Sequence, residues 1–583
     1  MKPAGVDRPL SVATALDRAL GDPLDDQRAG SFHTSVAADR KSRFPRELCA
    51  EALDWGLAEH LVPVECGGRF RSVEECFALA RVLSRRDLTA AVALGANLLA
   101  SLPVWLRGTS EQKRTVAHLL RSGDFLSFAL SEAEHGADVL ATEVTARRGV
   151  DGWNVDGTKW LINNAGHASG ATVVARTGDG VRGLTLFLLT PASADGGRWT
   201  PLPKVSTHGL RGSAFGGITF AGLTARDTDV IGRPGQGLEI LLHTLQMTRV
   251  LVAGFALGAL DTCLAAAVSF ARSRRLYGAE IIELEPVARR LVDAYTDLLI
   301  GETVARGACR AVQLCPDQLP LTSACVKYLV PQMAIDGIES LSVVLGARSY
   351  LAGGHWSGIF EKMRRDCAVT ALFDGSSPVN LSAIVDQLPA LASARAGADV
   401  DGVPPGVFST RAAGPTRLAE VDFDLATGSD AIHRGLTAAA EALQDESGDV
   451  LHARHLRELL GWCEAETAGI DADVTRRVGE ADWRRSGAAL DHAARYSHLH
   501  AAGACCWRWL AWREETTDPF VTSGAWLVSC LRRLVRRPGL EPEPAPLDDV
   551  DRALLSRLLG ARDEHFWLPD PDPSENLPDR EVK

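Results

Sequence analysis

Apolar residues recur every three or four positions through much of the first 124 residues, which is the period of a helix packed against a core. The period is clear in Leu48-Cys49-Ala50-Glu51-Ala52-Leu53 and in Cys76-Phe77-Ala78-Leu79-Ala80-Arg81-Val82-Leu83. Thr109 and Gln112 have the spacing of a capping box ahead of a further apolar run. We therefore predict a helical domain over residues 1–124.

Short alternating runs separated by turn residues replace this pattern from residue 125 onward. They are typical of strands and occur at 152–157, 171–176, 183–189 and 217–220. Gly232-Arg233-Pro234-Gly235-Gln236-Gly237 has the wrong glycine order for a dinucleotide-binding loop, and no strand-helix-strand unit surrounds it. We interpret it as the turn into the next helix, and residues 125–232 as a small β domain.

Long runs that are apolar on most faces then resume, at residues 238–272, 285–314 and 321–345. Such helices pack into the core of a bundle. We therefore predict a helical bundle domain over residues 233–390.

The composition turns to Ala, Gly, Pro and Ser between residues 391 and 418, which predicts a linker. A C-terminal helical extension is expected over 419–565, with its core or an interface anchored by tryptophans, namely Trp507, Trp509, Trp512 and Trp526. Residues 566–583 are acidic and proline-rich, so we expect a disordered tail. The fold class is thus mainly α with one small central β domain.

A net charge of -12 and a pI near 5.7 argue against binding to nucleic acid or to an acidic membrane, because both need clustered Lys and Arg. The most apolar stretch, 250–271, contains Asp261 and Thr262, so we expect a buried helix rather than a membrane span. The first 26 residues lack the pattern of a secretion signal, which favours a cytoplasmic protein.

The 12 cysteines form no C-x-x-C pair, which favours reduced thiols over a disulfide framework or a zinc site. His452 and His455 are close in sequence but have no matching Cys or carboxylate cluster, so no metal site is expected there.

One carboxylate stands out in the second half of the chain. Asp374 ends an apolar run and directly precedes Gly375-Ser376-Ser377, so we expect it at the point where regular structure ends and a turn begins. That is a suitable place for a catalytic base. The alternatives are that Asp374 initiates a turn or caps the next helix, expected over 380–388.

The order of these domains, together with the sequence motifs that follow, resembles the acyl-CoA dehydrogenase family of flavoproteins over residues 46–388. Segment 129–138 looks like the family's first flavin segment, L-T-E-P-x-A-G-S-D, and 157–164 resembles its second, G-x-K-x-W-I-T-N. Segment 204–213 looks like a loop on the substrate side of the β domain. Arg274-Arg275-Leu276-Tyr277-Gly278 is similar to R-x-x-F-G, and Gly346-Ala347-Arg348-Ser349-Tyr350 resembles G-G-x-G-Y.

The family's base is a Glu eight residues beyond the Asp of an R-D pair, and the same spacing leads here from Asp366 to Asp374. The resemblance implies an N-terminal helical domain, a β-barrel domain and a C-terminal four-helix bundle. It also implies FAD as cofactor, an enzyme that desaturates an acyl thioester at its α and β carbons, and a homodimer or homotetramer. A carrier protein is a possible second partner.

The resemblance assigns roles to individual residues. Asp374 becomes the base, which is expected to have a raised pKa in a dry site. Arg249, Gln246 and Gly375 become substrate-binding residues, although Arg249 has the alternative of pairing with Asp366 or Glu361. The cofactor residues implied are Ser131, Ala137, Leu161, Asn163, Arg274, Tyr277, Gly346 and Ser376.

Four positions depart from the family pattern. Asp374 is one methylene shorter than Glu, Asn163 replaces the Thr that bonds flavin N5, and Glu285 and Val343 each replace a Gln. These changes suggest a specialised substrate, as in natural-product biosynthesis. The alternative function is an oxygen-using flavoenzyme of the same fold, such as an oxidase or an epoxyketone-forming monooxygenase acting on a β-keto acid. A third alternative is a flavin-free interaction scaffold.

Overall fold

A computed structural model describes residues 9–150, 152–190, 198–397, 401–409, 414–445, 451–536 and 547–560. The expected disordered tail at 566–583 lies outside the described residues. By contacts the chain forms two compact units. The first comprises Met1–Ala259, Leu351–Ser376 and Gly414–Leu425, and the second comprises Leu260–Tyr350, Ser377–Ala413 and Ala426–Lys583.

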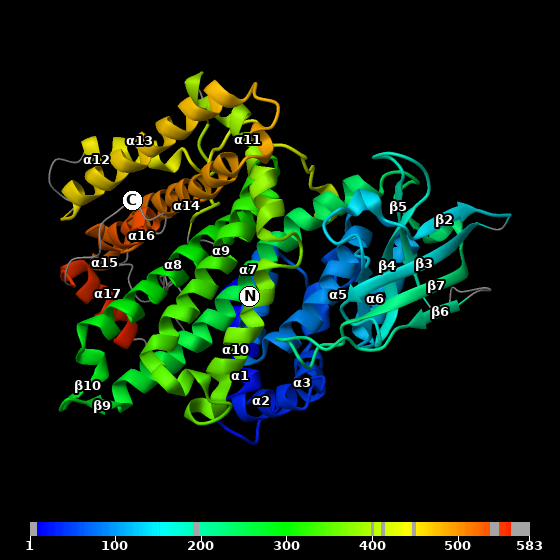
Figure 1. Cartoon of the computed structure of the whole chain (residues 1–583), viewed down its shortest axis with the longest axis horizontal. Helices are drawn as coiled ribbons and strands as arrows, with labels where there is room; N and C mark the ends of the chain where they lie inside the picture. Colours follow the sequence, from blue (N-terminus) through cyan, green and yellow to red (C-terminus); the bar gives the residue numbers. More distant parts are fainter. Residues whose placement is uncertain are drawn as a thin grey trace, which may run out of the picture. The chain divides into compact units, whose positions relative to one another are not determined.

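The first unit begins with helices, as the apolar period predicts (Figure 1). They are α1 (Pro9–Leu20), α2 (Phe32–Arg40), α3 (Arg46–Trp55), α4 (Val73–Arg86), α5 (Leu88–Arg107) and α6 (Ser110–Arg121). The predicted capping box is present at α6, where Thr109 and Gln112 each accept the other's backbone N–H. Asp87 caps α5 by accepting the N–H of Thr89 at 2.7 Å.

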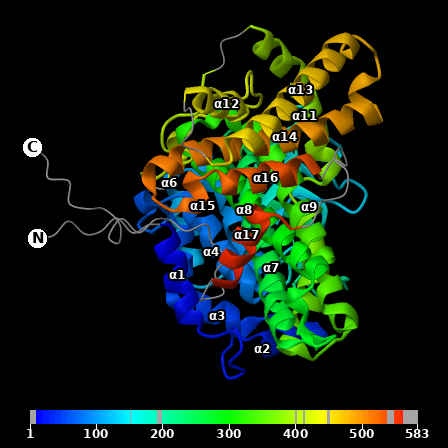
Figure 2. The ribbon, with the colours of Figure 1, turned by 90° about the vertical axis from the view of Figure 1, so that its left-hand side faces the viewer.

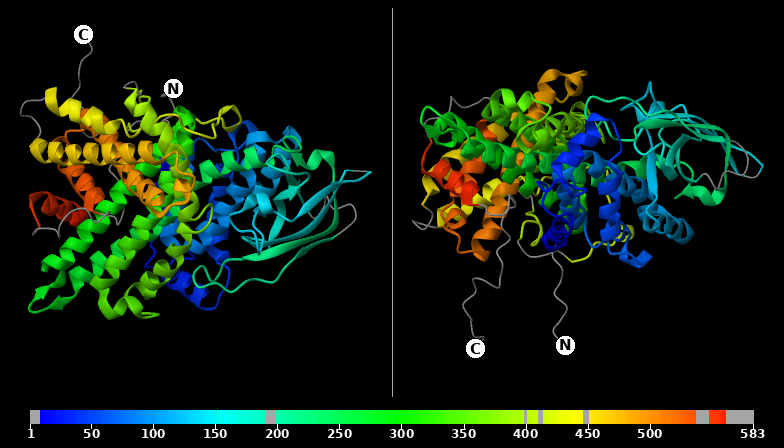
Figure 3. Two further views of the ribbon diagram at one scale, coloured as in Figure 1. Left: turned by 45° about the horizontal axis from the view of Figure 1, so that its top comes forward. Right: turned by 90° about the horizontal axis from the view of Figure 1, so that it is seen from below.

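The expected small β domain follows in the same unit (Figure 3). Its strands are β1 (Phe125–Ala129), β2 (Thr145–Arg148), β3 (Trp153–Ile162), β4 (Ala168–Arg176), β5 (Leu184–Leu189), β6 (Arg198–Pro201), β7 (Gly216–Ala225) and β8 (Val230–Ile231). Their order is β6-β7-β3-β2-β4-β5-β8, and β1 pairs in parallel with β4. One side packs a core that includes Val155, Phe187 and Phe220.

Helix α7 (Gly237–Ser273) starts in the first unit and continues into the second. The first unit is completed by α10 (Ile359–Cys367), a 3₁₀ turn η10 (Ala368–Ala371), and a short 3₁₀ turn η11 (Leu418–Glu420). Among the described residues, three helical stretches are long and apolar enough to cross a membrane by length and composition, at 88–107, 237–273 and 316–350. The apolar window of α7 is entirely buried in protein, which accounts for its composition.

The second unit contains the bundle helices α8 (Glu285–Leu314), α9 (Leu319–Leu345) and α11 (Ser377–Ala396), with the hairpin β9 (Arg275–Leu276) and β10 (Ala279–Glu280). The predicted long helices are therefore present. Helix α11 begins at Ser377 rather than at 380, and it runs to Ala396, past the expected start of the linker at 391.

The C-terminal helices belong to the same unit as the bundle. They are α12 (Gly435–Asp445), α13 (Ala453–Arg477), α14 (Gly487–Glu515), α15 (Pro519–Thr522), α16 (Ala525–Arg536) and α17 (Asp549–Gly560). Helix α14 contacts α8, α9 and α11, and α16 contacts α8 (Figure 2). Trp509, Trp512 and Trp526 are fully buried, as expected of core anchors, whereas Trp507 is partly exposed. The division by contacts thus joins the extension to the bundle.

Candidate functional site

Asp374 lies just after η10, where the chain leaves helical structure. Its backbone is left-handed, with φ of 55°, and Gly375 follows with φ of 95°. Few residues other than Gly, Asn and Asp adopt this conformation readily, and strained backbone is concentrated at functional sites. The turn predicted from Asp374-Gly375-Ser376 is present, and all three residues are partly buried.

Arg249 on α7 contacts Asp374. Its Nε donates a hydrogen bond to the backbone carbonyl of Asp374 at 3.3 Å. Burial lowers the pKa of Arg249 from its usual value, while the negative charge of Asp374 opposes that shift. The alternative partners expected for Arg249 are engaged elsewhere, because Asp366 binds Lys362 and Glu361 binds Arg365.

Gln246 lies one turn before Arg249 on α7 and is only 4% exposed. Its Nε2 donates to the carbonyl of Asp424 at 2.8 Å, and its buried Oε1 has no hydrogen-bond partner among the described residues. The structure therefore brings Gln246, Arg249, Asp374 and Gly375 into one region of the first unit.

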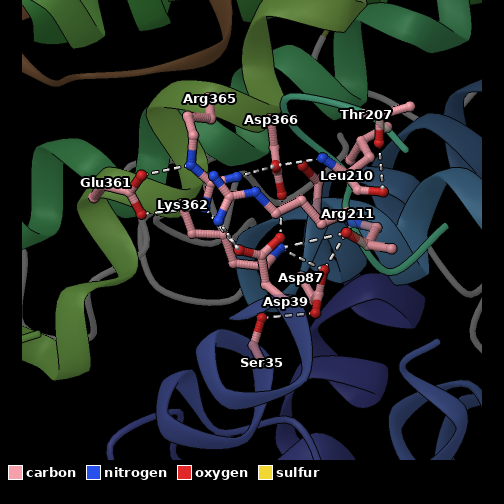
Figure 4. A network of polar contacts seen from close by, with 12 residues as sticks. Ser35, Asp39, Asp87, Thr207, Leu210, Arg211, Glu361, Lys362, Arg365 and Asp366 are labelled. Atoms are coloured by element: carbon pink, nitrogen blue, oxygen red, sulfur yellow. Dashed lines mark hydrogen bonds and ion pairs between the residues drawn. The ribbon is translucent and has the colours of Figure 1, made fainter. Parts of the chain in front are cut away.

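A buried ion network supports the segment that leads to Asp374 (Figure 4). Lys362 on α10 is 1% exposed, and its Nζ lies 2.8 Å from Asp87 Oδ1 and 2.7 Å from Asp366 Oδ2. Asp366 also accepts the backbone N–H of Leu210 at 2.6 Å. The network ties α10 to the start of α5 and to the loop at 204–213.

The charges in this network determine its protonation. Burial alone would lower the pKa of Lys362, but the charges of Asp366 and Asp87 raise it above its usual value. Burial raises the pKa of Asp366, and the charge of Asp39 adds to that effect, whereas Lys362 opposes it. Lys362 is therefore a protonated cation that holds buried carboxylates. No local pattern in the sequence indicates this role.

The first flavin-like segment is joined to β3. Ser131 accepts the N–H of Trp160 at 2.9 Å through its carbonyl, and its Oγ donates to the carbonyl of Trp160 at 3.1 Å. Ser131 is partly buried and Ala137 is exposed.

A second buried ion pair lies beneath this segment. Lys159 Nζ lies 2.7 Å from Glu132 Oε1, 2.8 Å from Thr142 Oγ1 and 2.8 Å from the Leu130 carbonyl. Burial lowers the pKa of Lys159 to about 8, although Glu132 opposes the shift. Burial alone would raise the pKa of Glu132, but its hydrogen bond and charge interaction with Lys159 bring it below the usual value.

Glu132 also belongs to a group of possible metal ligands that the sequence reasoning did not identify. Ligand atoms of Glu132, His135 and Glu143 lie within 4.8 Å of one another. The Glu132 carboxylate, however, already binds Lys159, Thr142 and two backbone N–H groups. It is therefore engaged in a structural network.

The second flavin-like segment ends in a turn held against α5. Leu161 is left-handed, with φ of 59°, and its side chain is 43% exposed, so it offers an open apolar surface. Asn163 donates through Nδ2 to the Val92 carbonyl at 3.0 Å and accepts the Asn164 N–H at 3.0 Å. One N–H of the Asn163 amide is left to serve a cofactor.

The remaining expected cofactor residues other than Ser376 lie in the second unit. Arg274 precedes the β9–β10 hairpin, and Tyr277 at its turn is left-handed and 94% exposed. Gly346 follows α9 with φ of 57°. A side chain at this position would have open space around it in the described part of the chain, apart from its chain neighbours. Glu285 accepts the N–H of Leu547 at 3.0 Å, and Val343 is exposed.

Comparison with known proteins covers most of the chain. Sequence models of three domains match, described as acyl-CoA dehydrogenase N-terminal domain at 33–124, middle domain at 127–223 and C-terminal domain at 235–388. The human mitochondrial short-chain specific acyl-CoA dehydrogenase is 29% identical over 366 residues, which is 61% of this chain and 86% of that protein.

Solved structures share the fold. An acyl-CoA dehydrogenase complexed with FAD from Bacillus anthracis covers 97% of this chain and 96% of its own, with a TM-score of 0.72 and 17% identity. The prolyl acyl carrier protein oxidase AnaB covers 64% of this chain and 96% of its own, with a TM-score of 0.57 and 20% identity. The Bacillus structure therefore shares the fold of the C-terminal helices as well.

Proposed function

Because the chain belongs to the acyl-CoA dehydrogenase family of FAD-dependent oxidoreductases, we propose that it desaturates an acyl thioester with Asp374 as the catalytic base. The observation that carries this proposal is the position of Asp374. It is a partly buried carboxylate on a left-handed turn, eight residues beyond the buried Asp366, with its own carbonyl held by Arg249.

The reaction needs a base that removes a weakly acidic α-proton while a β-hydrogen leaves with its electron pair. Bound FAD supplies the acceptor for that hydride. The Asp374 carboxylate takes the α-proton, and the two carbons are left joined by a double bond. The proposal assigns the backbone N–H of Asp374, beside Gly375, to the thioester oxygen, because polarising that carbonyl makes the α-proton more acidic.

Arg249 contributes by position and charge. Its bond to the Asp374 carbonyl fixes the turn that aims the carboxylate. Catalytic rates fall steeply when a reacting group is displaced by about 1 Å, so this anchor matters to the rate. Substrate and flavin would exclude water from the carboxylate, and desolvation would raise the pKa of Asp374 toward neutrality, as a base at neutral pH requires.

The backbone N–H groups of Ser131 and Ala137 and the exposed Leu161 would hold the flavin within the first unit. Arg274, Tyr277 and Gly346 would serve the flavin of a neighbouring subunit in a homodimer or homotetramer, with Ser376 beside the base contributing on its own side. Tyr277 is 94% exposed, so its side chain is accessible to a neighbouring subunit. The cytoplasmic location stays a prediction.

An oxygen-using reaction is the second candidate, and Asn163 is the observation that favours it. The amide of Asn163 is anchored to Val92, so any bond to the flavin comes from a different donor and position than a Thr hydroxyl provides. AnaB, which shares the fold, is a prolyl acyl carrier protein oxidase. The same site would then pass electrons to oxygen instead of to a protein acceptor.

The test is Asp374→Asn, which keeps the shape of the side chain but removes the base. We expect this variant to retain FAD and to lose flavin reduction by thioesters under anaerobic conditions, by at least 100-fold on the order expected for a general base. Asp386→Asn is the control, because Asp386 is an exposed carboxylate that pairs with Arg484. Reduction of the Asp374→Asn flavin at the wild-type rate would move the base elsewhere.

The same experiment separates the two candidate functions. After anaerobic reduction, oxygen is added and reoxidation is followed. Slow reoxidation that needs an added electron acceptor supports the dehydrogenase, whereas rapid reoxidation with an oxygenated product or hydrogen peroxide supports the oxygen-using enzyme.

A further inference from the structure

One segment of the C-terminal half returns to the first unit. Residues 414–425, which we call the strap, belong to the unit that contains Asp374, whereas residues 377–413 and 426 onward belong to the other unit. The strap includes η11 and three carboxylates, and its position is fixed by several contacts along its length.

The strap is anchored at both ends. The N–H of Thr416 donates to the Arg71 carbonyl at 2.6 Å, and Leu418 is buried where η11 contacts α5. Toward its far end, Phe423 is 6% exposed and stacks on His243 with ring centroids 5.3 Å apart and planes 23° apart. The next residue, Asp424, accepts the Gln246 amide through its carbonyl.

These contacts lie on the helix face that serves the candidate base. His243, Gln246 and Arg249 follow one another at steps of three residues on α7, so each is a surface neighbour of the next, with about 4.5 Å along the axis per step. Arg249 binds the Asp374 turn, and the strap covers the two positions before it. The strap therefore borders the site within about two helical turns of the base.

Gln246 indicates which part of a substrate meets the strap. Its Nε2 must point at the Asp424 carbonyl to donate, so the amide orientation is fixed and Oε1 is the acceptor left without a partner. A buried acceptor without a partner loses its hydrogen bond to water, and a ligand with an N–H donor at this point would restore one. The alkyl part of an acyl group has no such donor, but the pantetheine arm of a thioester carries amide N–H groups.

We propose that the strap is a specificity-determining wall of the Asp374 site and that it acts on the pantetheine arm of the substrate. Phe423 and His243 hold the strap against α7, and Gln246 offers its free acceptor to an amide of the arm. The inference rests on the proposed function for the thioester, and it gives the C-terminal half of the chain a part in substrate choice. Coenzyme A and a carrier protein both present this arm.

The test measures binding rather than turnover. Redox-inert thioethers with one common alkyl group are prepared on coenzyme A, on pantetheine and on 2-mercaptoethanol, which lacks both amide groups of the arm, and their affinities for the FAD-loaded protein are measured by calorimetry. For Phe423→Ala we expect binding of the first two to weaken by about tenfold, roughly the effect of one lost contact, and binding of the 2-mercaptoethanol compound to change less than twofold.

Leu425→Ala is the matched control, because Leu425 is an exposed apolar residue at the end of the same strap. We expect it to bind all three compounds as the wild type does. Equal weakening of all three by Phe423→Ala, or no weakening, would overturn the proposal. Hydrogen exchange supplies a second measurement: the pantetheine thioether should slow exchange in residues 414–425, and unchanged exchange there also counts against the proposal.

Two comparisons separate the possible sources and the possible failures. Much tighter binding of the coenzyme A compound than of the pantetheine compound indicates free coenzyme A thioesters, whereas equal binding indicates an arm delivered by a carrier protein. If the thioethers show the expected discrimination but no thioester reduces the flavin, desaturation fails and the strap proposal stands. If thioesters reduce the flavin but Phe423→Ala does not discriminate, the strap proposal fails alone.

Discussion

Lys362→Met tests directly whether the buried ion network of Lys362, Asp87 and Asp366 stabilises the segment before Asp374. Methionine keeps the length and apolar stem of the lysine but removes the ammonium group that lies 2.7–2.8 Å from two carboxylates. Asp87 and Asp366 are themselves buried, so neither gains water in exchange for the lost cation. The result is two buried carboxylates with like charge and no lysine between them (Figure 4).

The expected cost follows from that burial. Removing one partner of a buried ion pair typically costs about 3–5 kcal/mol, whereas an exposed pair is worth about 0–1 kcal/mol. If the first unit unfolds cooperatively, each kcal/mol lowers the midpoint by about 2–4 °C for a unit of this size, so the midpoint should fall by roughly 6–20 °C. Scanning calorimetry of the FAD-loaded protein measures this shift.

Two variants make the result decisive. Lys204→Met removes an exposed lysine that donates to the carbonyls of Ser42 and Arg211, and it should lower the midpoint by only about 1–3 °C. Adding Asp366→Asn to Lys362→Met removes one of the two buried negative charges while keeping an oxygen for the Leu210 N–H, so part of the loss should be recovered. If Lys362→Met shifts the midpoint no more than Lys204→Met, the network does not hold α10 as described.

Glu132→Gln leaves Lys159 buried without its anion, so we expect the free energy of unfolding to fall by about 3 kcal/mol. Denaturant titration measures this change. An unchanged free energy of unfolding would show that Lys159 is neutral in the folded protein. The pKa of Glu132 is lower in the folded protein than its usual value of about 4.5 in the unfolded chain. Ionised Glu132 therefore stabilises the folded protein at pH values above about 4.5, and this stabilisation is lost as the pH falls through the folded pKa. The midpoint of the wild type should therefore fall more steeply than that of Glu132→Gln below pH 4.5. Arg249→Lys keeps the charge but loses Nε, so flavin reduction should slow by about 10–100-fold with FAD content unchanged, and equal rates would show that the charge alone suffices.

The sequence predicted well those features that depend on neighbours a few residues apart. The helical period located α7, α8 and α9 to within two residues at each end, and the Thr109 and Gln112 spacing gave the capping box of α6. Asp374-Gly375 gave the turn, because Gly and Asp adopt left-handed backbone with little penalty. Each of these signals is contained within one or two helical turns of chain.

Contacts between distant parts of the chain were beyond that reasoning. Lys362 and Asp87 are 275 positions apart, and Gln246 and Asp424 are 178 apart. Nothing local distinguishes Lys362 from an exposed lysine on a helix, because its burial follows only from the packing of α10 against other elements. The strap was interpreted in part as linker for the same reason: its composition favours irregular structure, but irregular segments also bind surfaces.

The backbone at Asp374 bears on why an Asp stands where the family pattern has a Glu. A left-handed residue other than Gly costs on the order of 1 kcal/mol, and Asp tolerates it better than Glu because its short side chain bonds to nearby backbone. The shorter side chain also places the carboxylate about one C–C bond nearer to the backbone that Arg249 holds. A base that is retracted in this way suits a substrate whose α-carbon lies closer to the turn. The backbone conformation and the identity of this residue therefore both agree with a site in which Asp374 serves as the base in place of Glu.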